Sequence, residues 1–176
     1  MIVSLIGYMG SGKSHVSKLL SNQLHLKLID LDQQISFKTK LSIPEIFEKK
    51  GEIYFRKKEK EILEEIVNTE KNAILSVGGG TPAYYNNMNT LLEKTESFYL
   101  RTSVKNLVDR VSKQKNKRPL IARISDDDLP EYIAKHLFER QNFYSQAKFT
   151  IITDNKEAQN VADEIINLLY FPNLPR

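Results

Sequence analysis

The sequence predicts an α/β domain with a mostly parallel sheet that is covered by helices on both faces. Short apolar runs rich in β-branched residues alternate along the chain with longer segments of helical periodicity. No repeat, low-complexity tract or linker divides the 176 residues, and this length is typical of one domain. We therefore expect a single domain over residues 1–176.

Five apolar runs predict the strands of this sheet, because each is bounded by polar or turn-forming residues. These runs are Ile2–Ile6, Leu26–Ile29, Ala73–Val77, Ser97–Leu100 and Phe149–Ile152. Between them, apolar residues recur at helical spacing. The helices that we expect are Lys13–Leu24, Ile43–Lys49, Ile53–Asn68, Pro82–Glu93, Val104–Val111, Asp126–Gln146 and Lys156–Leu169.

The composition excludes several classes of function. The chain has no cysteine, and its three histidines lack the spacing of zinc ligands, so any metal would have to be held by oxygen. The net charge is only +4, and the basic segment 113–118 has no aromatic residues among its cations; we expect no nucleic acid partner. With no apolar run of membrane-spanning length and no secretion signal in the sequence, we expect no membrane partner and a cytoplasmic location. We also expect the chain to be a monomer.

Residues 112–124 predict a loop. The segment carries five cations and one proline with little apolar periodicity, so it is a poor helix former. It is either a mobile lid over a bound ligand or a solvated surface loop, and composition does not choose between the two.

Residues Gly7–Ser14 form the most specific motif. Gly7-Tyr-Met-Gly-Ser-Gly-Lys13-Ser14 fits the pattern G-x-x-x-x-G-K-[ST] and lies between a strand and a helix. Its glycines let backbone N–H groups surround a phosphate, and the helix that begins near Lys13 adds its positive end. Lys13 would reach the β- and γ-phosphates and the Ser14 hydroxyl would bind Mg²⁺. The motif predicts nucleoside triphosphate binding but does not define the reaction.

Two acids follow the second strand at the end where parallel α/β sheets bind ligands. The stretch Leu28–Asp32 ends this strand, so alternation places Asp30 and Asp32 on one face with Leu31 opposite. One carboxylate would then support Mg²⁺ while the other accepts a proton from an acceptor hydroxyl. The alternative is that Asp32 only caps the next helix.

Two arginines fall at inward positions of predicted helices. Arg56 lines up with Leu63 and Val67, and Arg140 lies in a row with Ile133 and Tyr144. Buried arginines need anionic partners, which are either the carboxylate of a small substrate or internal acids such as Glu52 and Glu139.

Three glycines, Gly78-Gly-Gly80, follow the third predicted strand and would let a ligand touch the main chain there. Thr81 and Pro82 then predict a helix start, with Thr81 as its N-cap. Further on, Ser125–Asp128 resembles a capping box, so its acids are expected to start a helix.

Taken together, these elements resemble shikimate kinase in order and spacing over nearly the whole chain. The matching elements are Gly7–Ser14, Asp30-Leu-Asp32, Phe55-Arg56, Gly78-Gly-Gly80, Lys117-Arg-Pro-Leu120 and Arg140-Gln-Asn-Phe-Tyr144. The resemblance implies a three-layer α/β/α P-loop NTPase fold with a five-stranded parallel sheet, related to nucleoside monophosphate kinases. It also implies transfer of the ATP γ-phosphoryl group to the 3-hydroxyl of shikimate, in aromatic amino acid biosynthesis, with Mg²⁺ as cofactor.

The resemblance carries over residue by residue. It implies the catalytic residues Lys13, Asp32 and Arg118, the last as a lid arginine. It implies nucleotide contacts from Gly10, Ser11, Gly12, Lys13, Ser14, His15, Arg110 and Arg118. It implies shikimate contacts from Asp32, Arg56, Gly78, Gly79, Gly80 and Arg140. Ser14 would bind Mg²⁺ directly, and Asp30 would reach it through water.

Two rival functions stay open at this point. A gluconate kinase would share the phosphate motif and the sheet, and its sugar-acid substrate would also need arginines. A regulatory module that binds a nucleotide without chemistry would keep the phosphate motif alone. Retention of Lys13, Asp32, Arg56, Arg118 and Arg140 together favours an enzyme.

Overall fold

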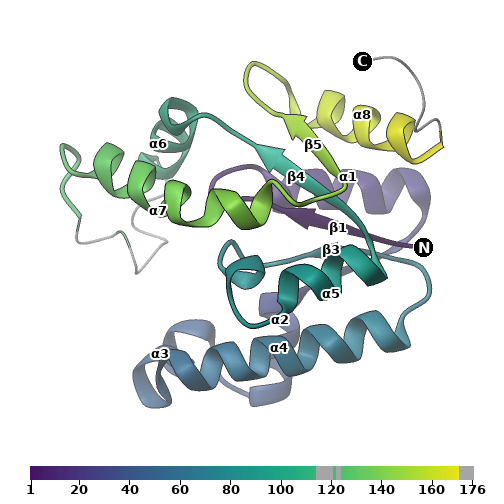
Figure 1. Cartoon of the computed structure of the whole chain (residues 1–176), viewed down its shortest axis with the longest axis horizontal. Coiled ribbons are helices and arrows are strands. Elements are labelled where there is room, and N and C mark those ends of the chain that lie inside the picture. The colour runs from purple at the N-terminus through teal and green to yellow at the C-terminus, as the bar shows by residue number, and fades with distance from the viewer. Residues whose placement is uncertain (114–120, 122–123, 171–176) are drawn as a thin grey trace.

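In the computed structural model, the chain is built around one parallel sheet with helices on both faces (Figure 1). The structure describes residues 1–113, 121 and 124–170. The strand order is β2-β3-β1-β4-β5, and each neighbouring pair is parallel. The strands are β1 (Ile2–Ile6), β2 (Lys27–Asp30), β3 (Ala73–Ser76), β4 (Glu96–Arg101) and β5 (Phe149–Ile152). The predicted five-stranded parallel sheet is thus confirmed, with strand ends that differ by one residue at most.

The central strands are apolar on both sides because helices cover both faces. Every residue of β1 is buried. Val3 and Leu5 belong to the core on one face, whereas Ile2 and Ile6 belong to the core on the other. Strand β1 therefore anchors both cores. The phosphate-binding motif Gly7–Ser14, which we call the cradle, begins directly after it.

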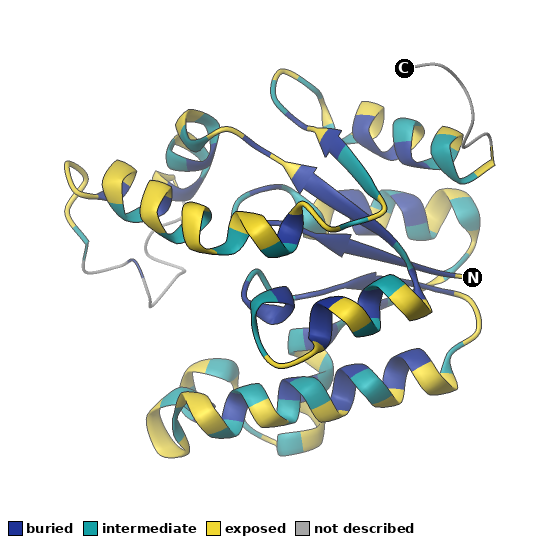
Figure 2. Ribbon diagram, viewed as in Figure 1, coloured by how far each residue is buried: buried dark blue, intermediate teal, exposed yellow. Residues whose placement is uncertain are grey.

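Helices α1 (Lys13–Leu24) and α8 (Ala158–Tyr170) pack against each other over one face. They bury Val16 and Leu20 of α1 with Val161 and Ile165 of α8 against the sheet. Figure 2 shows the buried central strands of the sheet between helices whose outer surfaces are exposed. This packing fixes the direction of α1 and therefore the position of the cradle at its N-terminus.

The remaining helices belong to the larger core on the opposite face. Buried residues from it include Leu63, Leu91, Val111 and Ile133. These helices are α2 (Leu31–Thr39), α3 (Ile43–Lys49), α4 (Gly51–Thr69), α5 (Asn87–Lys94), α6 (Val104–Ser112) and α7 (Leu129–Tyr144), with the 3₁₀ turn η1 (Thr81–Ala83) between β3 and α5.

Helix α2 was not predicted. Its sequence lacks a helical apolar pattern, because only Leu31 and Ile35 of its nine residues are buried and the others form no clear apolar stripe. Asp30 caps it by accepting a hydrogen bond from the Gln33 backbone. Strand β2 therefore ends at Asp30.

The predicted helix Pro82–Glu93 was wrong, because it is divided into η1 and α5. Tyr85 has a φ of 51°, which interrupts helical backbone geometry. Thr81 is the first residue of η1 and not a cap, and its hydroxyl donates to Glu59 instead. The hydrogen bond expected of a capping box at Ser125 is present, since the Asp128 N–H donates to Ser125 Oγ at 3.1 Å. The helix itself, α7, begins at Leu129 and not at Asp126.

No helix in the described part of the chain is long and apolar enough to cross a bilayer. Most of the segment expected to form a lid, residues 112–124, lies outside the described residues, and so does Arg118.

Candidate active site

The turn between β1 and α1 forms the cradle that the sequence predicts. Gly10 and Gly12 have φ angles of 84° and 97°, in the left-handed region that other residues avoid. Gly12 is the N-cap of α1 and has no side chain to cap the helix end. The Lys13 ammonium donates to the carbonyls of Gly7 and Tyr8 at 2.6 and 3.0 Å. A helix N-terminus and a cation thus meet at one place, which suits a phosphate.

Helix α6 packs against the back of this cradle. A β-carbon at Gly10 would lie 2.8 Å from Cγ2 of Val111, so this position has no room for a side chain. Arg110 Nη1 donates to the Gly10 carbonyl at 3.4 Å. Arg110, which was predicted to contact the nucleotide, therefore lies beside the phosphate cradle.

A cavity of about 540 Å³ opens in front of the cradle, a volume typical of small-molecule sites. Its lining has three parts. The cradle part consists of residues 9–16. The second part, at the carboxyl ends of β2 and β3, consists of Asp30, Asp32 and residues 76–79. The third part consists of Arg110, Thr153, Lys156, Ala158 and Val161.

The cavity therefore brings together most of the predicted site residues, from Gly10 through His15 with Asp30, Asp32, Gly78, Gly79 and Arg110. Three predicted substrate residues, Arg56, Gly80 and Arg140, do not line it. Of these, Gly80 lies directly beside the Arg56 guanidinium.

The two aspartates line this cavity, but not by strand alternation. Asp30 is the last residue of β2 and the N-cap of α2, whereas Asp32 is in the first turn of that helix. The predicted strand through Asp32 was therefore wrong, because the backbone turns into the helix after Asp30. Leu31, between them, is fully buried in the core. The capping role considered for Asp32 belongs to Asp30.

The pKa of Asp32 is raised from 3.8 to about 6. Burial is the largest cause, followed by the negative charges of Asp30 and Glu59, while Lys13 and Arg56 act in the opposite direction. A carboxylate with this pKa is mostly ionised at pH 7 and is still basic enough to accept a proton.

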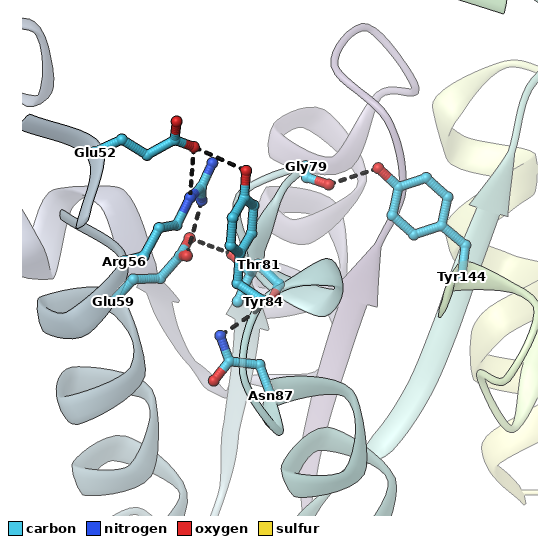
Figure 3. Close-up of polar contacts among 8 residues, drawn as sticks. All are labelled: Glu52, Arg56, Glu59, Gly79, Thr81, Tyr84, Asn87 and Tyr144. Atoms are coloured by element: carbon cyan, nitrogen blue, oxygen red, sulfur yellow. Dashed lines mark hydrogen bonds and ion pairs between the residues drawn. The ribbon is translucent and has the colours of Figure 1, made fainter. Parts of the chain in front are cut away.

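The glycine turn after β3 packs tightly on the cradle. A β-carbon at Gly79 would lie 3.4 Å from both the Gly7 carbonyl oxygen and the Met9 nitrogen. The Tyr144 hydroxyl donates to the Gly79 carbonyl at 2.5 Å (Figure 3). A β-carbon at Gly78 would lie 3.3 Å from Asp32 Oδ1. The turn thus connects the cradle, Asp32 and the end of α7.

Arg56 lies over the last glycine of this turn. Carboxylates hold its guanidinium group (Figure 3). Its Nη1 atom donates to Glu59 at 2.8 Å and its Nε atom to Glu52 at 3.3 Å. Its guanidinium carbon lies 4.0 Å from the centre of the Tyr84 ring. The internal ion pair with Glu52 that we considered is therefore present. Glu59 is a second partner that was not predicted.

Arg140 approaches the same region from α7. Its guanidinium carbon lies 5.8 Å from the centre of the Tyr8 ring. The pKa of Glu52 is lowered, first by the hydrogen bond from Tyr84 and further by the positive charges of Arg56 and Arg140. The charges of both predicted arginines therefore act on the same carboxylate, that of Glu52.

Sequence reasoning missed Glu59 and the role of Tyr144. Glu59 lies three residues after Arg56 on the same helix, which is the spacing of an ion pair, but its neighbours in sequence are also charged. Tyr144 follows Arg140 by four residues, so helical spacing placed it in the right row. Only the structure shows that its hydroxyl reaches Gly79.

The donors at the cradle suit Mg²⁺ and a triphosphate. No group of three or more histidine, cysteine, aspartate or glutamate side chains in the described ranges could hold a metal by itself. Mg²⁺ is commonly held by one or two protein oxygens together with substrate phosphates, and Ser14 and Asp30 both line the cavity beside Lys13. Ser11 Oγ is buried without a hydrogen-bond partner among the described residues, as expected where a ligand supplies one.

Fold and site together define a P-loop kinase that acts on a small molecule. A family model described as shikimate kinase matches residues 9–170. The chain belongs to the shikimate kinase family. The shikimate kinase of Flavobacterium psychrophilum is 44% identical over 170 residues, which cover 96% of this chain and 98% of the relative. That of a Sulfurihydrogenibium species is 39% identical over 165 residues, covering 93% and 95%.

Solved structures agree with this assignment. The crystal structure of shikimate kinase from Bacteroides thetaiotaomicron has a TM-score of 0.90 at 29% identity, covering 97% of this chain and 99% of that one. Shikimate kinase from Acinetobacter baumannii in complex with shikimate has a TM-score of 0.88 at 32% identity, covering 99% and 95%. A deoxyadenosine kinase from M. mycoides shares the fold, with a TM-score of 0.60 at 18% identity over 97% and 100% of the two chains.

Proposed function

We propose that this chain is a shikimate kinase, which transfers the γ-phosphoryl group of ATP to the 3-hydroxyl of shikimate and releases ADP. The observation that carries the proposal is the single cavity that joins the phosphate cradle to Asp32. Both the glycine cradle and the Asp32 carboxylate line this cavity, which supports the proposal because phosphoryl transfer to a hydroxyl needs a phosphate site next to a proton acceptor. Shikimate fits because it has both hydroxyls for Asp32 and a carboxylate for arginines.

In this proposal the arginines fix the orientation of shikimate. Arg56 and Arg140 hold its carboxylate through charge-assisted hydrogen bonds. The backbone of Gly79 and Gly80 closes the pocket behind the ring, at the point where Arg56 lies over Gly80. With the carboxylate fixed, the ring extends toward Asp32 and the cradle.

The chemical step needs one proton acceptor and several cations. The 3-hydroxyl oxygen forms a bond to the γ-phosphorus as the bond to the bridging oxygen of ADP breaks, and the hydroxyl proton passes to Asp32. Lys13 stabilises the charge on the β- and γ-phosphates. Arg118, in the lid proposed for residues 112–124, would cover the transferred group and exclude water.

Mg²⁺ would be held by Ser14, and by Asp30 through water, and would neutralise charge on the phosphates when bound. Ser11, Gly12 and His15 complete the proposed nucleotide contacts at the cradle. We also propose that residues 1–176 act as one domain, as a cytoplasmic monomer. Sedimentation or light scattering of the purified chain measures the oligomeric state directly.

A coupled assay of ADP release tests the function. With MgATP, the protein should release ADP rapidly only when shikimate is added, and the product should be shikimate 3-phosphate. ADP release that responds to gluconate and not to shikimate would overturn the assignment in favour of the sugar-acid kinase. ADP release that responds to neither would favour a nucleotide-binding module without chemistry.

A further inference from the structure

The third part of the cavity lining has no role in the chemistry described above. If phosphates occupy the cradle and the acceptor lies beside Asp32, the remaining wall must receive the nucleoside of ATP. This wall combines Arg110 of α6 with Thr153, Lys156 and Ala158, residues that follow β5 or begin α8. Its two segments are far apart in sequence, so contacts between them must fix their relative position.

The Asp154 carboxylate joins these two segments. It accepts hydrogen bonds from the Ser103 backbone N–H at 3.1 and 3.2 Å, from the Ser103 hydroxyl at 3.1 Å and from Asn106 Nδ2 at 2.5 Å. Ser103 is the N-cap of α6, and Asn106 is in its first turn. One side chain in the wall segment after β5 therefore binds the start of the helix that carries Arg110.

The ends of β4 and β5 are joined by hydrogen bonds that do not involve Asp154. Thr153 Oγ1 lies 2.6 Å from Thr102 Oγ1 in a buried contact, and the Thr153 N–H donates to the Arg101 carbonyl at 2.9 Å. These bonds continue the pairing of β4 with β5. Asp154 extends the connection from the strands to α6. Its hydrogen bonds therefore fix the position of the cavity wall and add little to the pairing of the sheet.

Charge acts in the same direction as the hydrogen bonds. The pKa of Asp154 is lowered: burial raises it, but the hydrogen bonds from Asn106 and Ser103 and the positive charge of Arg110 lower it by more. The carboxylate is thus ionised at neutral pH, and it interacts electrostatically with Arg110. Arg110 in turn donates to the cradle at Gly10.

We infer that Asp154 is a positioning residue for the nucleoside part of ATP, which it serves by holding the start of α6 and the segment after β5 at a fixed separation. It does not touch the phosphates or the acceptor. This inference rests on the proposed kinase function. It predicts an effect on ATP that is separable from any effect on shikimate or on the phosphate cradle.

The test compares Asp154→Ala and Asp154→Asn with a matched control, Asp163→Ala, which removes an aspartate that accepts from Gln23 and Gln159 away from the cavity. For Asp154→Ala we expect KM for ATP to rise roughly fivefold to tenfold, about the effect of losing charge-assisted hydrogen bonds. KM for shikimate should stay within about twofold. Asp154→Asn should recover part of the loss, since its oxygen still accepts from Ser103.

Inorganic tripolyphosphate provides the sharpest readout, because it carries the phosphates without a nucleoside. Its inhibition constant should be the same in wild type, Asp154→Ala and Asp163→Ala. Equal losses for ATP and tripolyphosphate, or an unchanged KM for ATP, would overturn the inference. A fall in thermal stability with both KM values unchanged would show a structural role only.

If Asp154→Ala does not fold, Asn106→Ala removes one donor to the same carboxylate and should shift KM for ATP in the same direction by a smaller factor; no shift would count against the inference. The proposed function is checked separately by the wild type. If the wild-type protein lacks shikimate-dependent ADP release, the kinase proposal fails, and calorimetric titration with ATP alone still measures the effect of Asp154.

Discussion

The Nη1 atom of Arg56 donates to Oε2 of Glu59 at 2.8 Å, and the side chain of Glu59 is only 1% exposed. The other oxygen of Glu59 accepts from the Thr81 hydroxyl at 2.6 Å. One buried carboxylate thus connects α4 to the turn that follows the three glycines. The guanidinium of Arg56 is therefore held in place before any substrate arrives, which lowers the cost of ordering it on binding.

Replacing Gly80 tests the placement of Arg56. A β-carbon at Gly80 would lie 2.7 Å from Arg56 Nη2 and 2.9 Å from Nη1, and the φ of Gly80 is −87°, which alanine adopts without strain. Gly80→Ala should fold and displace the guanidinium. We expect KM for shikimate to rise roughly tenfold with KM for ATP unchanged. Steady-state kinetics with each substrate varied measure both, and a shikimate KM equal to that of wild type would contradict the placement.

Glu59→Gln keeps the shape of the side chain but removes its charge. Arg56 then loses its buried partner, so we expect KM for shikimate to rise roughly fivefold. The pKa of Asp32 should fall below about 6, because the charge of Glu59 is one of the causes that raise it. Carbon NMR titration of the Asp32 carboxyl in the ligand-free protein measures this change. An unchanged or higher pKa would argue against the coupling.

Asp32→Asn should stabilise the protein while abolishing most turnover. Because the pKa of Asp32 is about 6 in the folded protein and ordinarily 3.8, the folded state holds a proton that the unfolded state has released between these pH values. Stability is therefore lost as pH rises through this window, by at most about 3 kcal/mol. The variant should be more stable than wild type above pH 6. Urea unfolding at several pH values checks this, and an advantage that grows toward pH 4 would have the wrong sign.

Lys13→Met removes the cation of the cradle. Lys13 has an apolar stem of similar length to methionine, so the fold should persist, while kcat/KM for ATP should fall at least roughly a hundredfold through loss of charge stabilisation. Lys18→Met is the control, since Lys18 is an exposed lysine of the same helix. A comparable loss in both variants would point to damage in α1 and not to a phosphate contact.

The fold was predictable where one local signal dominated. Glycine spacing and the apolar run before it define the cradle, and the bounds of α1 agree with the prediction. Helix α2 could not be predicted, because two buried residues do not make a periodic pattern. For the same reason the two aspartates were assigned to a strand, although their convergence on the cavity was expected.

The site was predictable as a set of residue types but not as a network. An arginine on the apolar stripe of a helix predicts an anionic partner, but the sequence alone does not identify that partner. The structure shows that Arg56 has Glu59 and Glu52 as partners and still lies over Gly80. Long-range contacts such as Tyr144 with Gly79 depend on how α7 packs, and no local pattern encodes that packing.

The most direct measurement compares shikimate with its methyl ester, which lacks the negative charge, in wild type, Arg56→Ala and Arg140→Ala. The account predicts that each substitution lowers kcat/KM for shikimate at least roughly tenfold and changes kcat/KM for the ester by less than about twofold, because the lost contact is already absent there. If either substitution costs the ester as much as it costs shikimate, that arginine does not hold the carboxylate and the proposed orientation of the substrate is wrong.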